Sequence, residues 1–266
     1  MHCLFYFLCG RIYLRLLGFG GCFVRIYYLS DIHIESFEGY LSDLEGVLPL
    51  EENHGKDWVV VAGDISSSPS VVRDILGYLA SKFAHVFFVM GNHEYRNDSP
   101  STYKSTEKLY KALLSSISNL HFLNNEVVEV DGLTVAGSTY WYELADNYSK
   151  AWWKTFSNDY VYVHRDWDDS NRHHDRDFKF LQSLKDRKID LLVTHFPPKS
   201  FRKERKEDSE LFSIKDSGIR PRYWICGHEH VCCDEDFNGS RVLMNPVGYQ
   251  DEDTSYIARY VDIEPM

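Results

Sequence analysis

Five short apolar runs recur along the chain, and each is followed directly by polar residues. The runs occupy residues 25–29, 58–62, 86–90, 189–193 and 223–226. Nearly continuous apolar runs of about five residues are typical of strands in a sheet whose two faces are both covered. The pattern therefore predicts buried strands at these five places.

Helical patterns lie between the predicted strands. In residues 71–83 the apolar side chains recur at a spacing of three and four, which places them on one face of a helix. Residues 105–117 and 175–188 show the same spacing. Alternating strands and helices indicate an α/β layered fold.

The remaining elements are hairpins near the middle and the end of the chain. Residues 126–137 and 231–244 contain central Asp-Gly and Asn-Gly pairs, which favour tight turns between antiparallel strands. Residues 254–263 form a closing strand in this interpretation. Because there is no internal repeat and no linker, we expect a single domain over residues 24–266.

Two segments stand apart from this alternation. Residues 1–23 contain glycines and arginines that interrupt every apolar stretch before it reaches the about 18–20 residues of a membrane span. We expect a disordered or loosely packed extension, and an alternative is that it is not native and that translation begins at Val24. Residues 146–177 are the most polar long stretch, with aromatic residues among charges. They are interpreted as an insertion or cap over one edge of the domain.

Composition narrows the class of protein. The chain has 266 residues, 44% hydrophobic and 26% charged, which is typical of a globular protein that buries a core without disulfides. Its net charge of −11 repels phosphate backbones, so we expect no broad nucleic-acid binding. We expect no membrane partner either, because no apolar run is long enough to span a membrane. The adjacent Cys232 and Cys233 do not fit a secreted disulfide framework, which favours a reducing compartment and a cytoplasmic location.

Polar residues of a narrow chemical kind follow all five predicted strands. They are Asp31 and His33, Asp64, Asn92, His195, and His228 and His230. Because active sites gather at the carboxyl ends of strands in α/β sheets, we expect these side chains to converge. His, Asp and Asn bind divalent metal ions. One ion takes about four to six donors, water included, so seven protein ligands favour two ions that share a carboxylate.

Each feature carries little weight alone, since a single His after a strand usually has a structural hydrogen bond. Five of the 12 histidines, the four named above and His93 directly after Asn92, fall within these motifs, however, and their joint occurrence predicts a site. Glycine precedes Asp64, Asn92 and His228. We expect it to let the backbone turn tightly, so that the next side chain points into the site.

The order Asp-x-His, Gly-Asp, Gly-Asn-His-Glu, His and Gly-His-x-His resembles the calcineurin-like metallophosphoesterase superfamily over residues 25–248. Residues 192–198, 224–230 and 245–249 are similar to a group of small phosphohydrolases, mostly from bacteria and phages. The Arg that follows Gly-Asp in Ser/Thr protein phosphatases is missing, and Glu94 stands in place of an Asp. These departures argue against a protein phosphatase.

The resemblance implies a four-layered αββα sandwich and a particular distribution of ligands. Its implied ligand sets are Asp31, His33 and His230 for one ion and Asn92, His195 and His228 for the other, with Asp64 as the bridge. We expect two divalent ions, with Mn²⁺ favoured and Fe, Zn, Co, Ni or Mg also compatible with mixed nitrogen and oxygen donors.

The implied reaction is hydrolysis of a phosphodiester or phosphomonoester by a metal-bound hydroxide. Asp64 and His93 are the expected catalytic residues, because in the resembled family this His stabilises or protonates the leaving oxygen. A structural role is the alternative for His93, and Glu94 either orients a neighbour or caps the next loop. The substrate is expected to be a small-molecule or nucleotide-type phosphoester. The other interpretations are a nuclease of the same superfamily, which the acidic charge disfavours, and a non-catalytic scaffold, which would tolerate loss of ligands.

Candidates for substrate binding are fewer. Residues 199–206 are mostly basic and include Arg202, so they either steer an anionic substrate or form a solvated loop. His164 and Arg165, together with Trp152 and Trp153, either line a pocket or pack the insertion. The oligomeric state and the physiological substrate stay open.

Overall fold

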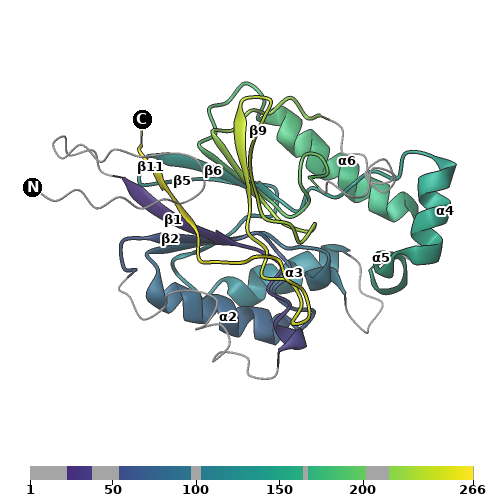
Figure 1. The fold of residues 1–266 in the computed structure, drawn as a ribbon, viewed down its shortest axis with the longest axis horizontal. Helices are drawn as coiled ribbons and strands as arrows, with labels where there is room; N and C mark the ends of the chain where they lie inside the picture. Colours follow the sequence, from purple (N-terminus) through teal and green to yellow (C-terminus); the bar gives the residue numbers. More distant parts are fainter. Residues whose placement is uncertain (1–22, 38–53, 97–102, 164–166, 202–215, 266) are drawn as a thin grey trace, which may run out of the picture.

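Two β-sheets packed face to face, with helices on their outer sides, form the protein (Figure 1). The computed structural model describes residues 23–37, 54–96, 103–163, 167–201 and 216–265. The first sheet has the order β11 (Tyr260–Ile263), β1 (Val24–Leu29), β2 (Trp58–Val61), β3 (His85–Phe88) and β4 (Leu120–Phe122). Strands β1 to β4 are parallel, and β11 is antiparallel to β1.

The second sheet also has a parallel centre, but both of its edge strands are antiparallel to their neighbours. Its order is β5 (Glu126–Val130), β6 (Leu133–Ser138), β7 (Leu191–Thr194), β8 (Tyr223–Cys226), β10 (Ser240–Met244) and β9 (Cys233–Phe237). Both predicted hairpins are present at the two edges of this sheet. The Asp-Gly and Asn-Gly pairs form the turns that join their strands, as the sequence indicates.

Helices cover the outer faces of both sheets (Figure 1). The helices α2 (Pro69–Lys82) and α3 (Tyr103–Leu114) pack on the first sheet, and α6 (Trp167–Ser183) packs on the second. The short helices α4 (Asn147–Phe156) and α5 (Asn158–Tyr162) lie at one side of the molecule, within the stretch predicted as an insertion. The predicted α/β class and four-layered αββα sandwich are confirmed.

Three apolar cores separate the four layers, and strand β2 shows why its sequence is apolar at every position. Trp58 and Val60 point into the core between the sheets, whereas Val59 and Val61 point into the core under α2 and α3. All four side chains are almost fully buried. A strand with both faces covered has no solvent-facing position to make polar.

The sequence prediction fails most clearly at α6, which begins at Trp167 and ends at Ser183 instead of spanning residues 175–188. Its buried face carries polar residues, among them His174 and Asp177. The Asp177 carboxylate accepts hydrogen bonds from the backbone N–H groups of Tyr140 and Trp141. Because buried polar residues replace the apolar stripe in the first part of α6, the helical period is hidden there, whereas Leu181 near its end lies in the apolar core.

Smaller differences concern the chain ends. Strand β11 is limited to Tyr260–Ile263, the last part of the predicted strand 254–263. Residues 1–22 lie outside the described residues, and β1 begins at Val24. Within the described ranges, Cys226, Cys232 and Cys233 are free thiols, and no helix there combines the length and apolar character that a membrane span needs.

Two glycine substitutions test the layer packing with opposite signs. A Cβ at Gly137 of β6 would lie 2.6 Å from Leu123 Cβ and 2.9 Å from Val89 Cγ1, both in the core between the sheets. Gly137→Ala is expected to lower the free energy of unfolding by about 1–3 kcal/mol through overpacking. In α2, a Cβ at Gly77 would meet only Ile117 Cδ1 at 3.9 Å. Gly77→Ala is therefore expected to raise the free energy of unfolding by about 0.5–1 kcal/mol. Urea unfolding in the presence of EDTA measures both, and a Gly137→Ala variant as stable as wild type would contradict this packing.

Candidate metal centre

The predicted ligands lie together where the carboxyl ends of the parallel strands of both sheets meet. Backbone hydrogen bonds tie their loops to one another: Asp31 N–H donates to Gly63 O at 3.0 Å, and Gly227 N–H donates to His195 O at 2.9 Å. Ser30, directly after β1, forms a bridge with Pro246, two residues after β10. The loops of the two sheets therefore form one connected structure around the site.

One cluster of donor atoms contains Asp31, His33 and His230, whose candidate ligand atoms all lie within 4.8 Å of one another. His33 Nε2 is 3.1 Å from His230 Nε2, and His230 Nε2 is 3.5 Å from Asp31 Oδ1. Two imidazole lone pairs facing each other beside a carboxylate repel unless a proton or a cation lies between them. The donor set therefore fits a divalent cation. On its far side, His230 Nδ1 forms a hydrogen bond with the Glu252 carboxylate, a contact that fixes the ring orientation.

A second cluster contains Asp31, Asp64 and His195. His195 Nδ1 lies 2.8 Å from the carbonyl oxygen of Ala62, so Nδ1 carries the proton and Nε2 faces the cluster. That Nε2 lies 3.0 Å from Asn92 Oδ1 and 3.5 Å from Asp64 Oδ2. Each of these atoms offers a lone pair to the same small space.

His228 lies beside this second cluster. Its ring centroid is 5.3 Å from that of His195. Its backbone N–H donates to both carboxylate oxygens of Asp31 at 3.0 Å. His228 thus holds the Asp31 carboxylate through its backbone N–H, and its ring lies beside that of His195.

Asp64 lies between the clusters, since its Oδ2 is 3.9 Å from His33 Nε2 as well as 3.5 Å from His195 Nε2. Burial raises the pKa of Asp64, but the neighbouring imidazoles outweigh it and hold that pKa well below its ordinary value. For Asp31 the same balance, with His230 as the partner, gives a pKa of about 2. Conversely, burial lowers the pKa of His195 and of His230. Asp64 and Asp31 outweigh it at His195, and Asp31 and Glu252 outweigh it at His230, so that both pKa values are raised to about 9. Protons on these imidazoles therefore supply the positive charge that a cation would otherwise provide.

Most of these residues have a left-handed backbone, which costs roughly 1–2 kcal/mol for a residue other than glycine. The φ angles are 51° at Asp31, 44° at His33, 56° at Asp64, 71° at His228 and 51° at His230. Such strain persists only where the surrounding structure imposes it, and it is concentrated at functional sites. Here the hydrogen bonds between loops impose it.

Glu94 is the group that holds two of these loops together. It is buried, and its carboxylate accepts hydrogen bonds from the backbone N–H groups of Gly91, Asp64, Ile65 and Ser66 at 2.7, 2.9, 2.7 and 3.4 Å. Burial and the Asp64 carboxylate raise the pKa of Glu94 to about 7, and the amide donors oppose that rise. Of the two roles considered from the sequence, the geometry matches orientation of neighbouring groups.

The glycines before the ligands are needed for close approach more than for turning. Gly63 has a φ of 86°, as expected for a tight turn. At Gly91 a Cβ would overlap Asp64 Oδ1, and at Gly227 it would lie 2.7 Å from Asp31 Oδ2. The absence of a side chain at these two positions lets the carboxylates lie against the backbone of the next loop.

His93 points into the same space. Its backbone N–H donates to Asp64 Oδ1 at 2.8 Å. Its ring contacts Glu35 at 3.4 Å, Arg96 at 3.3 Å and Tyr249 at 3.3 Å. Burial lowers the pKa of His93, but Asp64 and Glu35 outweigh it and raise that pKa above its ordinary value. The ring is therefore fixed and inclined to hold a proton.

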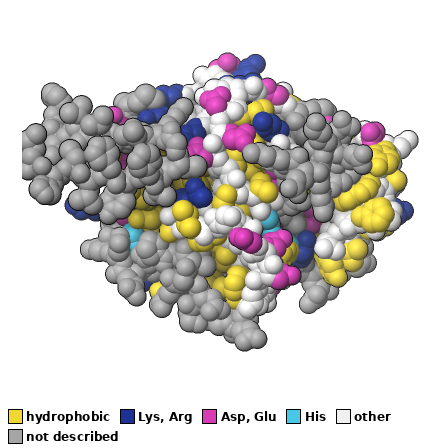
Figure 2. Space-filling model, viewed as in Figure 1, with side chains coloured by type: hydrophobic (Ala, Val, Ile, Leu, Met, Phe, Trp, Pro, Cys, Tyr) yellow, Lys and Arg dark blue, Asp and Glu magenta, His cyan; other side chains and the backbone are white. Residues whose placement is uncertain are grey.

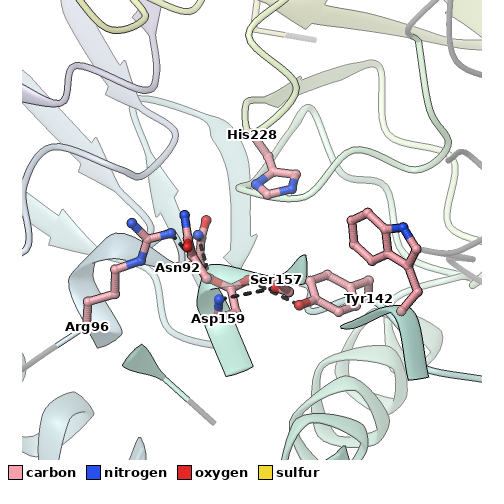
Figure 3. A pocket seen from close by; sticks show the side chains of 8 residues that line it. Asn92, Arg96, Tyr142, Ser157, Asp159 and His228 are labelled. Carbon is pink, nitrogen blue, oxygen red and sulfur yellow. Dashed lines mark hydrogen bonds and ion pairs between the residues drawn. The ribbon is translucent and has the colours of Figure 1, made fainter. Parts of the chain in front are cut away.

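A pocket opens beside this centre, between the sheet loops and α4–α5 (Figure 3). It is lined by Asn92, Arg96, Tyr142, Trp152, Ser157, Asn158, Asp159 and His228. Trp152 thus lies on the pocket wall, whereas Trp153 is buried and donates from Nε1 to the Tyr142 hydroxyl at 2.8 Å. On the face shown in Figure 2, histidine atoms are visible beside acidic side chains, and apolar side chains gather over the short helices.

The remaining substrate candidates, His164, Arg165 and Arg202, lie outside the described residues. The sequence motifs do not mark Glu35, Arg96, Tyr249 or Asp159 as site residues. Arg96 lies two residues after the Gly-Asn-His-Glu motif, and Tyr249 is the last residue of the motif at 245–249. Proximity to a motif could therefore have indicated these two residues. Asp159 has no such signal, because only the folded chain brings it to Asn92.

Comparison with known proteins identifies relatives of this chain. Protein L509 of Acanthamoeba polyphaga mimivirus is 24% identical over 279 residues, covering 90% of this chain and 96% of that protein. The acyl-carrier-protein phosphodiesterase PptH of Mycobacterium tuberculosis is 33% identical over 69 residues, or 26% of this chain and 20% of PptH. The crystal structure of PptH, described there as a phosphopantetheinyl hydrolase, superposes with a TM-score of 0.67 at 18% identity, covering 91% of this chain and 97% of that chain. At this identity the superposition demonstrates a shared fold.

A family profile extends over most of the chain. The profile of calcineurin-like phosphoesterases matches residues 24–232, which include all seven predicted ligands and His93. The order of the motifs, the sandwich and the profile agree. This chain belongs to the calcineurin-like phosphoesterase family.

Proposed function

We propose that this protein is a phosphoesterase that hydrolyses a phosphodiester or phosphomonoester with two divalent metal ions. The observation that carries the proposal is the position of Asp64, whose Oδ2 lies 3.9 Å from His33 Nε2 and 3.5 Å from His195 Nε2, between residues of the two proposed ligand sets. A carboxylate shared by two donor sets suits a pair of ions.

The predicted ligands form two sets, one for each ion. Asp31, His33 and His230 would hold one ion, Asn92, His195 and His228 the other, and Asp64 both. When bound, such ions make a nucleophile available from water at neutral pH and offset charge on the phosphoryl oxygens. Mn²⁺ is the first ion to test, and Fe, Zn, Co, Ni and Mg are the others that this donor set accepts.

His93 is the proposed general acid. Its ring lies at the edge of the centre, and the neighbouring Asp64 and Glu35 favour its protonated form. A proton held there can pass to the oxygen of the departing alcohol, which is otherwise a poor leaving group. Glu35 and Tyr249 can accept from the two ring nitrogens and keep the protonated ring in place, whereas the Arg96 guanidinium can only donate and opposes the proton.

The substrate class follows from the pocket. Trp152, Tyr142 and Arg96 give it aromatic surface and one positive charge next to Asn92 and His228. Such a lining fits a phosphoester whose alcohol is a small-molecule or nucleotide-type group. The name of PptH, a phosphodiesterase with the same fold, makes diesters the first substrates to test.

The direct experiment compares hydrolysis of bis-p-nitrophenyl phosphate with that of p-nitrophenyl phosphate, each with Mn²⁺ and with EDTA. We expect metal-dependent turnover, faster on the diester. His93→Asn is expected to retain its metal and to lose about 10²- to 10⁴-fold in kcat, because it removes the proton donor. Asp64→Asn is expected to lose bound metal, since it removes the shared anionic ligand.

His85→Asn is the matched control, since His85 lies at the amino end of β3, away from the centre. It should keep wild-type kcat and metal content. Purified wild-type protein that binds metal but hydrolyses neither ester would favour a scaffold over an enzyme.

Metal uptake should depend on pH in a defined direction. Without a cation, His195 and His230 have pKa values of about 9, so both carry protons at pH 7. Ligation requires the neutral rings, and therefore protons leave as metal binds. We expect the Mn²⁺ affinity of the EDTA-treated protein to rise steadily between pH 6.5 and 8.5, with proton release in calorimetry at pH 7.5 in buffers of different ionisation enthalpy. An affinity that is constant over this range would contradict the protonated centre.

Glu94→Gln should destabilise the centre before any chemistry occurs. One amide group of Gln donates where Glu94 now accepts two backbone N–H groups, so two buried donors lose their acceptor. The expected loss in free energy of unfolding is on the order of 3 kcal/mol, measured by urea unfolding in EDTA. Glu129→Gln on the exposed side of β5 is the control and should change stability by less than about 0.5 kcal/mol.

A further inference from the structure

We propose that Asp159, from the short helix α5, is a positioning residue that fixes the Asn92 side chain with its oxygen towards the metal centre. This inference rests on the proposed function, in which Asn92 is a ligand. Asn92 Nδ2 donates to Asp159 Oδ1 at 2.9 Å, and Asp159 is 5% exposed (Figure 3). The two residues are 67 positions apart in the chain.

An asparagine side chain can face a cation in only one of its two orientations. Its amide oxygen has lone pairs to offer, whereas its NH₂ group is a donor only. A carboxylate accepts and does not donate, so Asp159 can pair only with Nδ2 of Asn92. Oδ1 is then left on the opposite side, 3.0 Å from His195 Nε2. A flipped amide would set its oxygen against the Asp159 carboxylate and its NH₂ group against the centre.

Asp159 is itself held from several elements. The Tyr142 hydroxyl donates to Asp159 Oδ2 at 3.1 Å, and Trp153 Nε1 of α4 donates to that hydroxyl at 2.8 Å. Arg96 Nη2 lies 3.5 Å from Asp159 Oδ1. Burial and the Asp159 carboxylate raise the pKa of Tyr142 well above its ordinary value, so the hydroxyl stays protonated and donating. Both carboxylate oxygens are thus occupied, which leaves Asp159 one position.

The consequence is a coupling between α4–α5 and the metal centre. Second partners that orient a ligand typically contribute a factor of about 10–100 to metal affinity. Docking of α5 supplies this partner, since Asp159 is carried by that helix. The short helices therefore complete the ion site that contains Asn92, and they also line the pocket.

The first experiment compares Asp159→Ala with Asp146→Ala. Asp146 is the N-cap of α4 and accepts a hydrogen bond from Ser149 N–H at 2.7 Å, so its loss weakens the same segment without contacting Asn92. We expect two Mn²⁺ per chain in wild type and in Asp146→Ala. For Asp159→Ala we expect about 10–100-fold weaker binding of one ion, measured by titration and by elemental analysis after gel filtration. Asp159→Asn should rescue most of this affinity, because its Oδ1 still accepts from Asn92.

The second experiment exchanges donor and acceptor. Asn92→Asp alone places two carboxylates at hydrogen-bond distance, and it should lower the Tm of the metal-free protein. In the double variant Asn92→Asp with Asp159→Asn, the new amide donates to the new carboxylate, and the Tm should recover towards that of wild type. This readout uses no activity and no bound ion.

The outcomes separate the two proposals. A wild-type protein that binds no divalent ion overturns the proposed function. A wild-type protein with two ions, together with an Asp159→Ala variant that binds both ions with unchanged affinity, overturns only the positioning role. Equal metal loss in Asp159→Ala and Asp146→Ala would also overturn it, since general weakening of the segment would then explain the effect.

Discussion

The buried charge of Asp64 is the constraint on which the rest of the centre depends. Removing a carboxylate from water costs several kcal/mol unless positive charge and hydrogen bonds compensate it. Around Asp64 this compensation comes from His33, His195 and the backbone N–H of His93. Asp31 repeats the arrangement with His230 a short distance away. Two such anions beside several imidazoles form a site whose lowest-energy state contains bound positive charge, as protons or as metal ions.

This arrangement strains the backbone, and the packing of the two sheets maintains the strained conformations. Asp31, His33 and His230 have left-handed conformations that would relax in an isolated loop. Hydrogen bonds from loop to loop, and the four amides gathered by Glu94, prevent relaxation because each loop is anchored in a buried strand. The sandwich thus acts as a rigid support, and the metal-binding geometry is a property of both sheets together.

The short helices α4 and α5 connect the centre to the pocket beside it. Trp152 forms part of the pocket wall, and Asp159 contacts Asn92 in the centre. A family whose metal sites share one chemistry must obtain its substrate preference from such added segments. In this chain the same segment lines the pocket and contacts Asn92.

The sequence by itself determined the buried strands, the order of the ligands and the family, because strands covered on both faces must be apolar and metal donors must follow them. Tertiary structure decided where α6 begins, because the buried face of its first part is polar and shows no apolar period. It also decided that Glu94 gathers amides, that Gly91 is needed for close approach, and that Asp159 reaches Asn92. These features depend on contacts between segments far apart in the chain, and a local pattern of residue types carries no record of such contacts.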